Sequence, residues 1–177
     1  LIKGMGIAPA APVVVAGNGP LLLVAAANLV SVGVEVAAVV EASNRPWNIV
    51  RHAGKLIHGG SNLGLAIKYL KILYKSKIPF LRGYGVIAAY GSECLSAVDV
   101  APIIRNGKFE RSQARRITAK TMVTGMGLTP SLELPRLLGL KETSMPLRGG
   151  PNIITNEKMM SSVFGVFVAG DGSSIGG

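Results

Sequence analysis

The chain has 177 residues, enough for one ordinary domain or for one domain and part of a second. Hydrophobic residues make up 49% of it, with 23 glycines and 5% aromatic residues, which excludes a disordered chain and is typical of an α/β protein. The formal net charge is +10, but the longest basic stretch, Arg111 to Lys120, contains no aromatic residue, so we interpret it as a solvated strand edge or loop and expect no nucleic-acid partner.

The counts of cysteine and histidine exclude several kinds of site. Cys94 is the only cysteine, so this chain contains no disulfide, no CxxC redox pair and no thiolate iron–sulfur or zinc site. We expect Cys94 to be inert core, and one cysteine favours a reducing, cytoplasmic compartment. His52 and His58 have no carboxylate near them in sequence, so no metal site is predicted.

The first forty residues read as a strand, a glycine turn, a helix and a second strand. A short amphipathic piece, Leu1 to Met5, and a loop precede an apolar strand over Pro12–Ala16. Pro20 is suited to the first position of a helix over Leu21–Val32, which Gly33 ends. Val34–Val40 then forms a buried strand that ends in Glu41, giving a βαβ unit.

A membrane span must also be weighed, because residues 4–34 carry no charge. That run is longer than the ~20 apolar residues that a spanning helix needs. Pro9, Pro12 and the turn Gly17-Asn18-Gly19 interrupt it, and they would leave backbone groups unpaired in lipid. We therefore expect a buried strand and helix, and no membrane span.

The turn Gly17-Asn18-Gly19-Pro20 predicts a nucleotide site. Its glycines allow a tight turn and close approach of a pyrophosphate to helix N–H groups. The usual third glycine is replaced by Leu22, so helix and strand are expected to lie slightly further apart. Glu41 lies near the distance, about 20 residues, at which an acid binds the adenosine ribose, which favours NAD-like over NADP-like ligands. Arg45 could partly reverse that preference by meeting a 2′-phosphate. The alternative is a structural turn that holds no nucleotide.

The middle of the chain predicts helices followed by antiparallel strands. Trp47–Ile57 and Ser61–Tyr74 are expected to be helical, with Asn62 as a cap, and Ile78–Gly83 to be a strand. Val86–Tyr90 and Leu95–Ile104 are expected to pair through the turn at Gly91, and Asn106-Gly107 is a hairpin signal. These strands predict a small antiparallel layer from about Val86 to Arg111.

The last third contains two further glycine turns. A strand over Arg116–Thr124 leads into Gly125-Met126-Gly127, where backbone can pass close to a dinucleotide, and Pro130 is expected to start a helix over Ser131–Leu138 that Gly139 ends. After a loop, a buried strand over Val163–Ala169 leads into Gly170-Asp171-Gly172. A carboxylate so placed suits the ribityl or phosphate-side hydroxyls of a flavin nucleotide, although a capped glycine turn would have the same sequence.

Taken in order, these three motifs resemble the pyridine nucleotide-disulfide oxidoreductase superfamily, in which an NAD(P) domain is inserted between two parts of an FAD domain. The segments that most resemble opine oxidase A subunits, the cyanide synthase B subunit and dye-linked amino-acid dehydrogenase α subunits are LLLVAAANL and GDGSSIGG. The resemblance implies a nucleotide site at Gly17, Gly19 and Pro20 with Glu41 at the ribose, and an FAD site at Gly170, Asp171 and Gly172. The first FAD motif of the family is absent, and the chain looks truncated at both ends.

We therefore expect a Rossmann-like, three-layer α/β domain over residues 1–140 and an incomplete FAD-binding part over residues 141–177. The nucleotide site would consist of Gly17, Asn18, Gly19, Pro20, Glu41, Arg45, Gly125 and Gly127, with FAD and with NAD(P) or another adenine nucleotide as cofactors. The expected function is oxidation of an amine, amino acid or opine as one subunit of a flavoprotein complex. No catalytic residue is nominated. The alternative is a non-catalytic, nucleotide-binding structural subunit of a heteromeric dehydrogenase.

Overall fold

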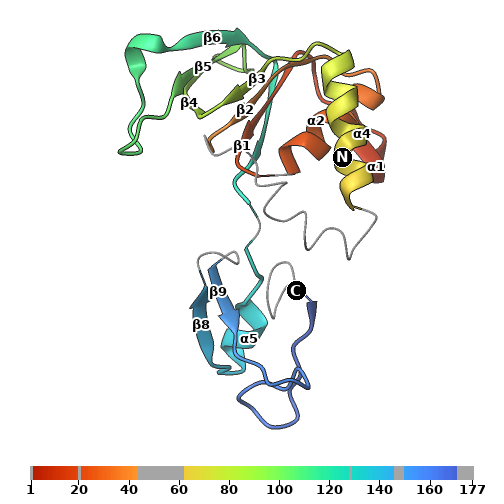
Figure 1. Cartoon of the computed structure of the whole chain (residues 1–177), viewed down its shortest axis with the longest axis vertical. Coiled ribbons are helices and arrows are strands. Elements are labelled where there is room, and N and C mark those ends of the chain that lie inside the picture. The colour runs from red at the N-terminus through yellow and green to blue at the C-terminus, as the bar shows by residue number, and fades with distance from the viewer. Residues whose placement is uncertain (1, 20, 44–61, 128, 146–149, 171–177) are drawn as a thin grey trace. The chain divides into compact units, whose positions relative to one another are not determined.

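The structure is a computed structural model that describes residues 2–19, 21–43, 62–127, 129–145 and 150–170. The chain divides into two compact units, Leu1–Met126 and Gly127–Gly177 (Figure 1). The helix expected over Trp47–Ile57, together with His52 and His58, lies outside the described residues.

The first unit is built on a parallel sheet with the strand order β3-β2-β1-β7. After the short helix α1 (Ile2–Met5), the strand β1 (Val13–Gly17), the helix α2 (Leu21–Ser31) and the strand β2 (Val36–Glu41) form the expected βαβ unit. The helix α4 (Asn62–Lys75) leads to β3 (Phe80–Arg82), and β7 (Thr121–Gly125) pairs with the other side of β1. This is the order of one half of a doubly wound nucleotide-binding fold.

The two faces of the parallel sheet are covered by different layers (Figure 1). On one face, Val13, Val15 and Val39 pack with side chains of α2 and with Leu73 of α4. On the other face, the residues that alternate with these along the strands pack against the second sheet. The cluster on that face contains Val14, Ala16, Ala38, Val40, Val98, Val100 and Ala119. Because side chains alternate along a strand and both faces are buried, β1 reads as a continuous apolar run.

The second sheet is antiparallel, in the order β4-β5-β6. β4 (Tyr84–Tyr90), β5 (Ala97–Pro102) and β6 (Arg115–Thr118) form it, and a short 3₁₀ helix, η1 (Arg111–Gln113), precedes β6. The expected turn at Asn106-Gly107 is present, closed by a single bridge between Ile103 and Phe109, and Gly107 has a φ of +77°. The expected three-layer α/β class is confirmed.

The single strand expected over Arg116–Thr124 is wrong, because the segment is shared between both sheets. The Ala119 amide donates to the carbonyl of Ser96 (3.1 Å), and the next amide, that of Lys120, donates to the carbonyl of Pro12 (2.8 Å). The pairing partner therefore changes within one residue. β6 therefore belongs to the antiparallel sheet and β7 to the parallel sheet.

The second unit contains the helix α5 (Glu133–Leu137) and the hairpin of β8 (Glu142–Met145) and β9 (Gly150–Ile153). The prediction that Pro130 starts the helix is wrong, because the N-cap residue is Leu132. The loop expected after Gly139 is also wrong, since β8 and β9 pair there. A small core of Leu132, Leu140 and Ile153, with Val166 and Val168 against it, holds the unit together.

The buried strand expected over Val163–Ala169 is not formed either. Phe167 makes one isolated bridge, with Met160, and its side chain is 62% exposed. The pairing partner is the tight turn after Asn156, whose side chain accepts hydrogen bonds from the amides of Lys158 and Met160.

Two further predictions concern Cys94 and a membrane span. Cys94 is exposed in the turn between β4 and β5, so the prediction that it is core is wrong. Within the part of the chain that the structure describes, no helix is long and apolar enough to cross a membrane.

Candidate functional site

Four residues lie side by side at the carboxyl edge of the parallel sheet. The strand register pairs Gly125 with Gly17, Gly17 with Glu41, and Glu41 with Arg82. These residues end β7, β1, β2 and β3, and we call them the edge row. In open α/β sheets, ligands bind outside the carboxyl ends of the strands, at the point where the strand order reverses. Here that point lies between β1 and β7, where the two glycines meet.

Gly17 is required by the close packing of this edge. Its φ is +145°, and a Cβ built on it would lie 1.9 Å from the carbonyl oxygen of Gly125. The Asn18 amide donates to the same carbonyl oxygen (2.7 Å), and the Gly17 carbonyl accepts from the amide of Ala42 (2.8 Å). These contacts lock the end of β1 between its two neighbours.

Gly19 differs, because space lies open in front of it. Its φ is +94°, and among the residues that the structure describes no atom lies within 4 Å of the position of a Cβ there. Asn18 beside it is exposed, and α2 begins two residues further on with the Leu22 amide donating to the Gly19 carbonyl (3.3 Å). An open approach to the N-terminus of an eleven-residue helix is the arrangement that suits a diphosphate. Pro20 lies outside the described residues.

Leu22 stands where a third glycine is usual. It is 2% exposed, packs in the cluster between α2 and the sheet, and its Cδ2 lies 3.6 Å from the position of a Cβ on Gly125. Gly125, which has no side chain, therefore leaves the space into which Leu22 packs.

Glu41 is buried, with 2% of its side chain exposed, and its Oε2 lies 3.8 Å from the Nε of Arg82. Arg82 also lies over the ring of Phe80, with its Cζ 5.0 Å from the ring centroid. Sequence reasoning missed Arg82. The signal in the sequence was the position of Arg82 at the end of β3, the strand that follows β2 in the chain. Because neighbouring parallel strands end at the same edge of the sheet, a cation at the end of β3 lies beside the acidic residue at the end of β2.

The remaining predicted site residues are not part of the edge row. Gly127, with a φ of +103°, and Gly170, with a φ of +72°, belong to the second unit. Arg45, Asp171 and Gly172 lie outside the described residues.

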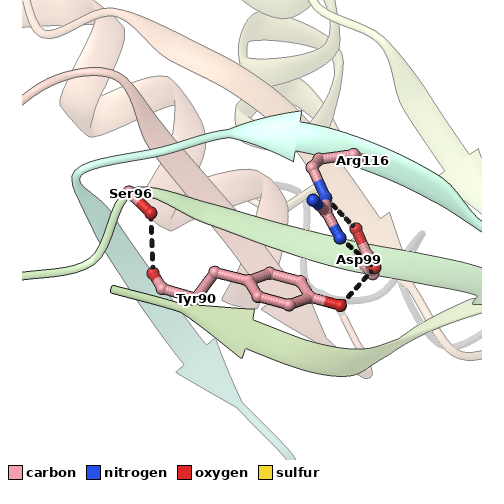
Figure 2. Close-up of polar contacts among 4 residues, drawn as sticks. All are labelled: Tyr90, Ser96, Asp99 and Arg116. Carbon is pink, nitrogen blue, oxygen red and sulfur yellow. Dashed lines mark hydrogen bonds and ion pairs between the residues drawn. The ribbon is translucent and has the colours of Figure 1, made fainter. Parts of the chain in front are cut away.

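A second polar cluster lies on the antiparallel sheet (Figure 2). Arg116 of β6 binds Asp99 of β5 through Nε (2.8 Å) and Nη2 (3.0 Å), the Tyr90 hydroxyl donates to the same carboxylate (2.7 Å), and the Arg116 Cζ lies 4.0 Å from the centroid of the Tyr90 ring. Hydrogen bonds from Arg116 and then Tyr90 lower the pKa of Asp99 to about 2. The hydrogen bond to Asp99 is the main reason that the pKa of Tyr90 is raised.

This cluster ties the three strands together and accounts for one of the basic residues of the Arg111–Lys120 stretch. Arg111, Arg115, Arg116 and Lys120 are all exposed, on η1, on the edge strand β6 and in the link that follows it. The prediction of a solvated strand edge is confirmed. Among the described residues, no group of three or more His, Cys, Asp or Glu side chains could hold a metal ion.

The layers and the strand order define the class of the first unit as a Rossmann-like α/β fold. The chain belongs to the pyridine nucleotide-disulphide oxidoreductase family, whose model matches residues 5–175. Proteins of this family use FAD and NAD(P). The resemblance expected from the three glycine motifs is confirmed.

Individual relatives agree with this assignment. Hydrogen cyanide synthase subunit HcnB of Pseudomonas protegens is 33% identical over 176 residues, which are 99% of this chain and 37% of the relative. The opine oxidase A subunit of Agrobacterium tumefaciens is 30% identical over an alignment of 180 residues that covers 99% of this chain and 33% of the relative. The chain thus spans about a third of the length of these curated relatives.

Solved structures support the fold. Thioredoxin reductase of T. acidophilum has a TM-score of 0.62 at 20% identity, over 92% of this chain and 44% of that chain. Bacillithiol disulfide reductase Bdr of Staphylococcus aureus has a TM-score of 0.63 at 15% identity, over 96% of this chain and 45% of that chain.

Proposed function

We propose that this chain is part of an FAD-dependent oxidoreductase subunit that oxidises an amine, an amino-acid derivative or an opine. The observation that carries the proposal is the family match over residues 5–175, together with an edge row that leaves open space at Gly19. The substrate class is inferred from relatives named as opine oxidase and hydrogen cyanide synthase subunits.

The two domains expected from the sequence have separate parts in this proposal. Residues 1–140 would bind NAD(P) or another adenine nucleotide, with the diphosphate at Gly19 and the N-terminus of α2 and the ribose at Glu41. Residues 141–177 would form part of the FAD-binding domain. Gly170, with its φ of +72°, would begin the turn that presents Asp171 and Gly172 to the flavin nucleotide. When bound, the flavin supplies the electron-transfer chemistry, and the residues of this chain bind and orient.

Two further proposals concern the assembly and the compartment of the protein. The names of the relatives describe subunits, which favours a hetero-oligomer with a second flavoprotein subunit. A chain with one cysteine suits a reducing, cytoplasmic compartment. A non-catalytic, nucleotide-binding structural subunit is the second candidate function, since one member of a complex need not carry the reaction itself.

The test is purification of the complete protein that contains this chain, followed by its flavin spectrum and its reduction by an amine, an amino acid or an opine. We expect bound FAD, and we expect Asp171→Ala to release it, because the carboxylate would bind the flavin hydroxyls. A colourless protein that takes up no added FAD would contradict the proposal. FAD binding without reduction by any of these substrates, even with a co-purified partner, would favour the structural subunit.

A further inference from the structure

Two asparagines of the chain are followed by glycine, and the structure holds them differently. They are Asn18, in the turn before α2, and Asn106, in the turn between Ile103 and Phe109. Asparagine followed by glycine deamidates readily, because glycine has no Cβ to hinder the attack of its backbone nitrogen on the asparagine side chain. Since the reacting pair is the same in both turns, the surroundings in the fold decide which of the two reacts.

The turn at Asn106 holds both reacting groups. The Gly107 amide donates to the carbonyl of Ile104 (2.9 Å), and the Asn106 Oδ1 accepts a hydrogen bond from the amide of Lys108 (3.0 Å). The nitrogen that would attack is therefore occupied, and the carbonyl that it would attack is fixed on another amide. Both hydrogen bonds must break before the two groups can react, which slows the reaction.

The turn at Asn18 holds neither reacting group. The Asn18 side chain is exposed, and among the described residues neither this side chain nor the amide of Gly19 makes a hydrogen bond. The backbone of Asn18 is fixed, since its own amide donates to the Gly125 carbonyl (2.7 Å). No described atom lies within 4 Å of the position of a Cβ on Gly19, so the approach to Gly19 from that side is open.

We propose that Asn18 is a site of spontaneous deamidation, and that the product blocks the turn to a diphosphate. The Gly19 nitrogen attacks the Asn18 Cγ, so that the N–Cγ bond forms, the Cγ–Nδ2 bond breaks, and ammonia leaves with the amide proton. Water then opens the succinimide ring at either of its carbonyls, which leaves aspartate or isoaspartate at position 18. Both products carry a carboxylate where the neutral amide stood.

The effect on the ligand rests on the proposed function. A carboxylate at position 18 would lie beside Gly19 and the N-terminus of α2, where the diphosphate is proposed to bind, and it would repel the phosphate charges. A diphosphate already bound there would cover the Gly19 amide and slow its attack. The unoccupied protein would therefore be modified first.

The test is peptide mapping by mass spectrometry of the complete protein during incubation at mildly alkaline pH, with the rate of conversion measured at both asparagines. We expect Asn18 to convert roughly tenfold faster than Asn106, since only the second must break two hydrogen bonds. In the protein unfolded by urea the two rates should be similar, which controls for the local sequence. The proposal is overturned if Asn18 does not convert, if Asn106 converts as fast, or if unfolding leaves the ratio of the rates unchanged.

A second measurement, calorimetry with NADH, tests the effect on the ligand. Asn18→Asp, which carries the charge of one product, should weaken NADH binding by roughly tenfold, whereas the matched control Asn106→Asp should leave it unchanged. Added NADH should slow conversion at Asn18 and not at Asn106. Equal affinities of the two variants, or equal conversion of Asn18 with and without NADH, would overturn the effect on the ligand.

The two measurements separate this inference from the proposed function. If the unchanged protein binds neither NADH nor NADPH, the proposed nucleotide site is wrong, while faster conversion of Asn18 than of Asn106 would still establish the deamidation site. If the unchanged protein binds NADH and Asn18 does not convert, the nucleotide site stands and the deamidation site is wrong.

Discussion

The two glycines of the first turn differ in what surrounds them. A Cβ on Gly17 would collide with the Gly125 carbonyl, whereas a Cβ on Gly19 would enter open space. Gly17 is therefore required by the fold itself. A substitution there would disrupt the edge of the sheet, so a loss of nucleotide binding in that variant would not show that Gly17 contacts the nucleotide. Nucleotide binding is better probed at Gly19, although its φ of +94° means that any other residue there also carries backbone strain.

The Asp99 carboxylate predicts a loss of stability in acid. Its pKa in the folded state is lowered from 3.8 to about 2, mainly by the hydrogen bonds from Arg116. A group whose pKa is depressed by folding stabilises the protein above its unfolded pKa, and this contribution disappears as the pH falls through the folded pKa. We expect the free energy of unfolding to decrease as the pH falls from about 4 towards 2, and Asp99→Asn to make the decrease smaller.

The measurement is urea unfolding at a series of pH values for the wild type and Asp99→Asn. Other carboxylates titrate in the same range, so the difference between the two proteins is the quantity that matters. Arg116→Gln, which removes the first donor, should also reduce the slope. Equal slopes in all three proteins would show that the cluster in Figure 2 does not couple folding to pH.

At the scale of elements, α2 is held to the sheet by one side of its surface. Leu22, Leu23, Ala26 and Leu29 are buried, whereas Leu21 is 47% exposed. Leu22 stands in the place of the usual third glycine, and Gly125, which has no side chain, leaves room for it. The side chain of Leu22 on α2 thus fits the space left by Gly125 at the end of β7, and each of the two residues suits the other.

We predict that Leu22→Ala destabilises the first unit by about 2–5 kcal/mol, since it removes buried methyl groups and leaves a cavity in a packed core. Leu21→Ala, the neighbouring change on the exposed side of the same helix, should cost less than about 1 kcal/mol. Both values come from chemical unfolding monitored by circular dichroism. Similar costs for the two variants would contradict the packing of α2.

At the scale of the whole molecule, large apolar side chains are exposed in the second unit. Leu137 is 84% exposed, Phe164 is 93% exposed and Phe167 is 62% exposed. Exposed apolar surface of this kind favours association with another apolar surface.

We therefore predict that the 177-residue chain self-associates when it is produced by itself, and that Leu137→Ser with Phe164→Ser lowers its average mass in sedimentation velocity. The matched control is Val32→Ser in the first unit, a smaller apolar side chain that is 51% exposed, which should leave association unchanged. A monomer at all concentrations, before any substitution, would contradict this prediction.

Local patterns were enough to predict much of the first unit. The apolar run of β1, the glycine turn, α2 and β2 follow from residue types that each have one dominant backbone preference, and the turn at Asn106-Gly107 follows in the same way. The positions of Gly17, Gly19 and Glu41 at a carboxyl edge also follow, since strand ends meet at one edge of a parallel sheet.

What the amino-acid sequence by itself determined is therefore the unit of β1, α2 and β2, the layers and the acidic strand end. Only the tertiary structure decided which strand each segment pairs with. The amides of Ala119 and Lys120 donate to different sheets, β8 pairs with β9, and Val163–Ala169 forms a single bridge and no ladder. It also placed Arg82 beside Glu41 and Leu22 against Gly125. The reason is physical, because an extended segment has the same local preference whichever neighbour completes its hydrogen bonds, and only long-range packing chooses the neighbour.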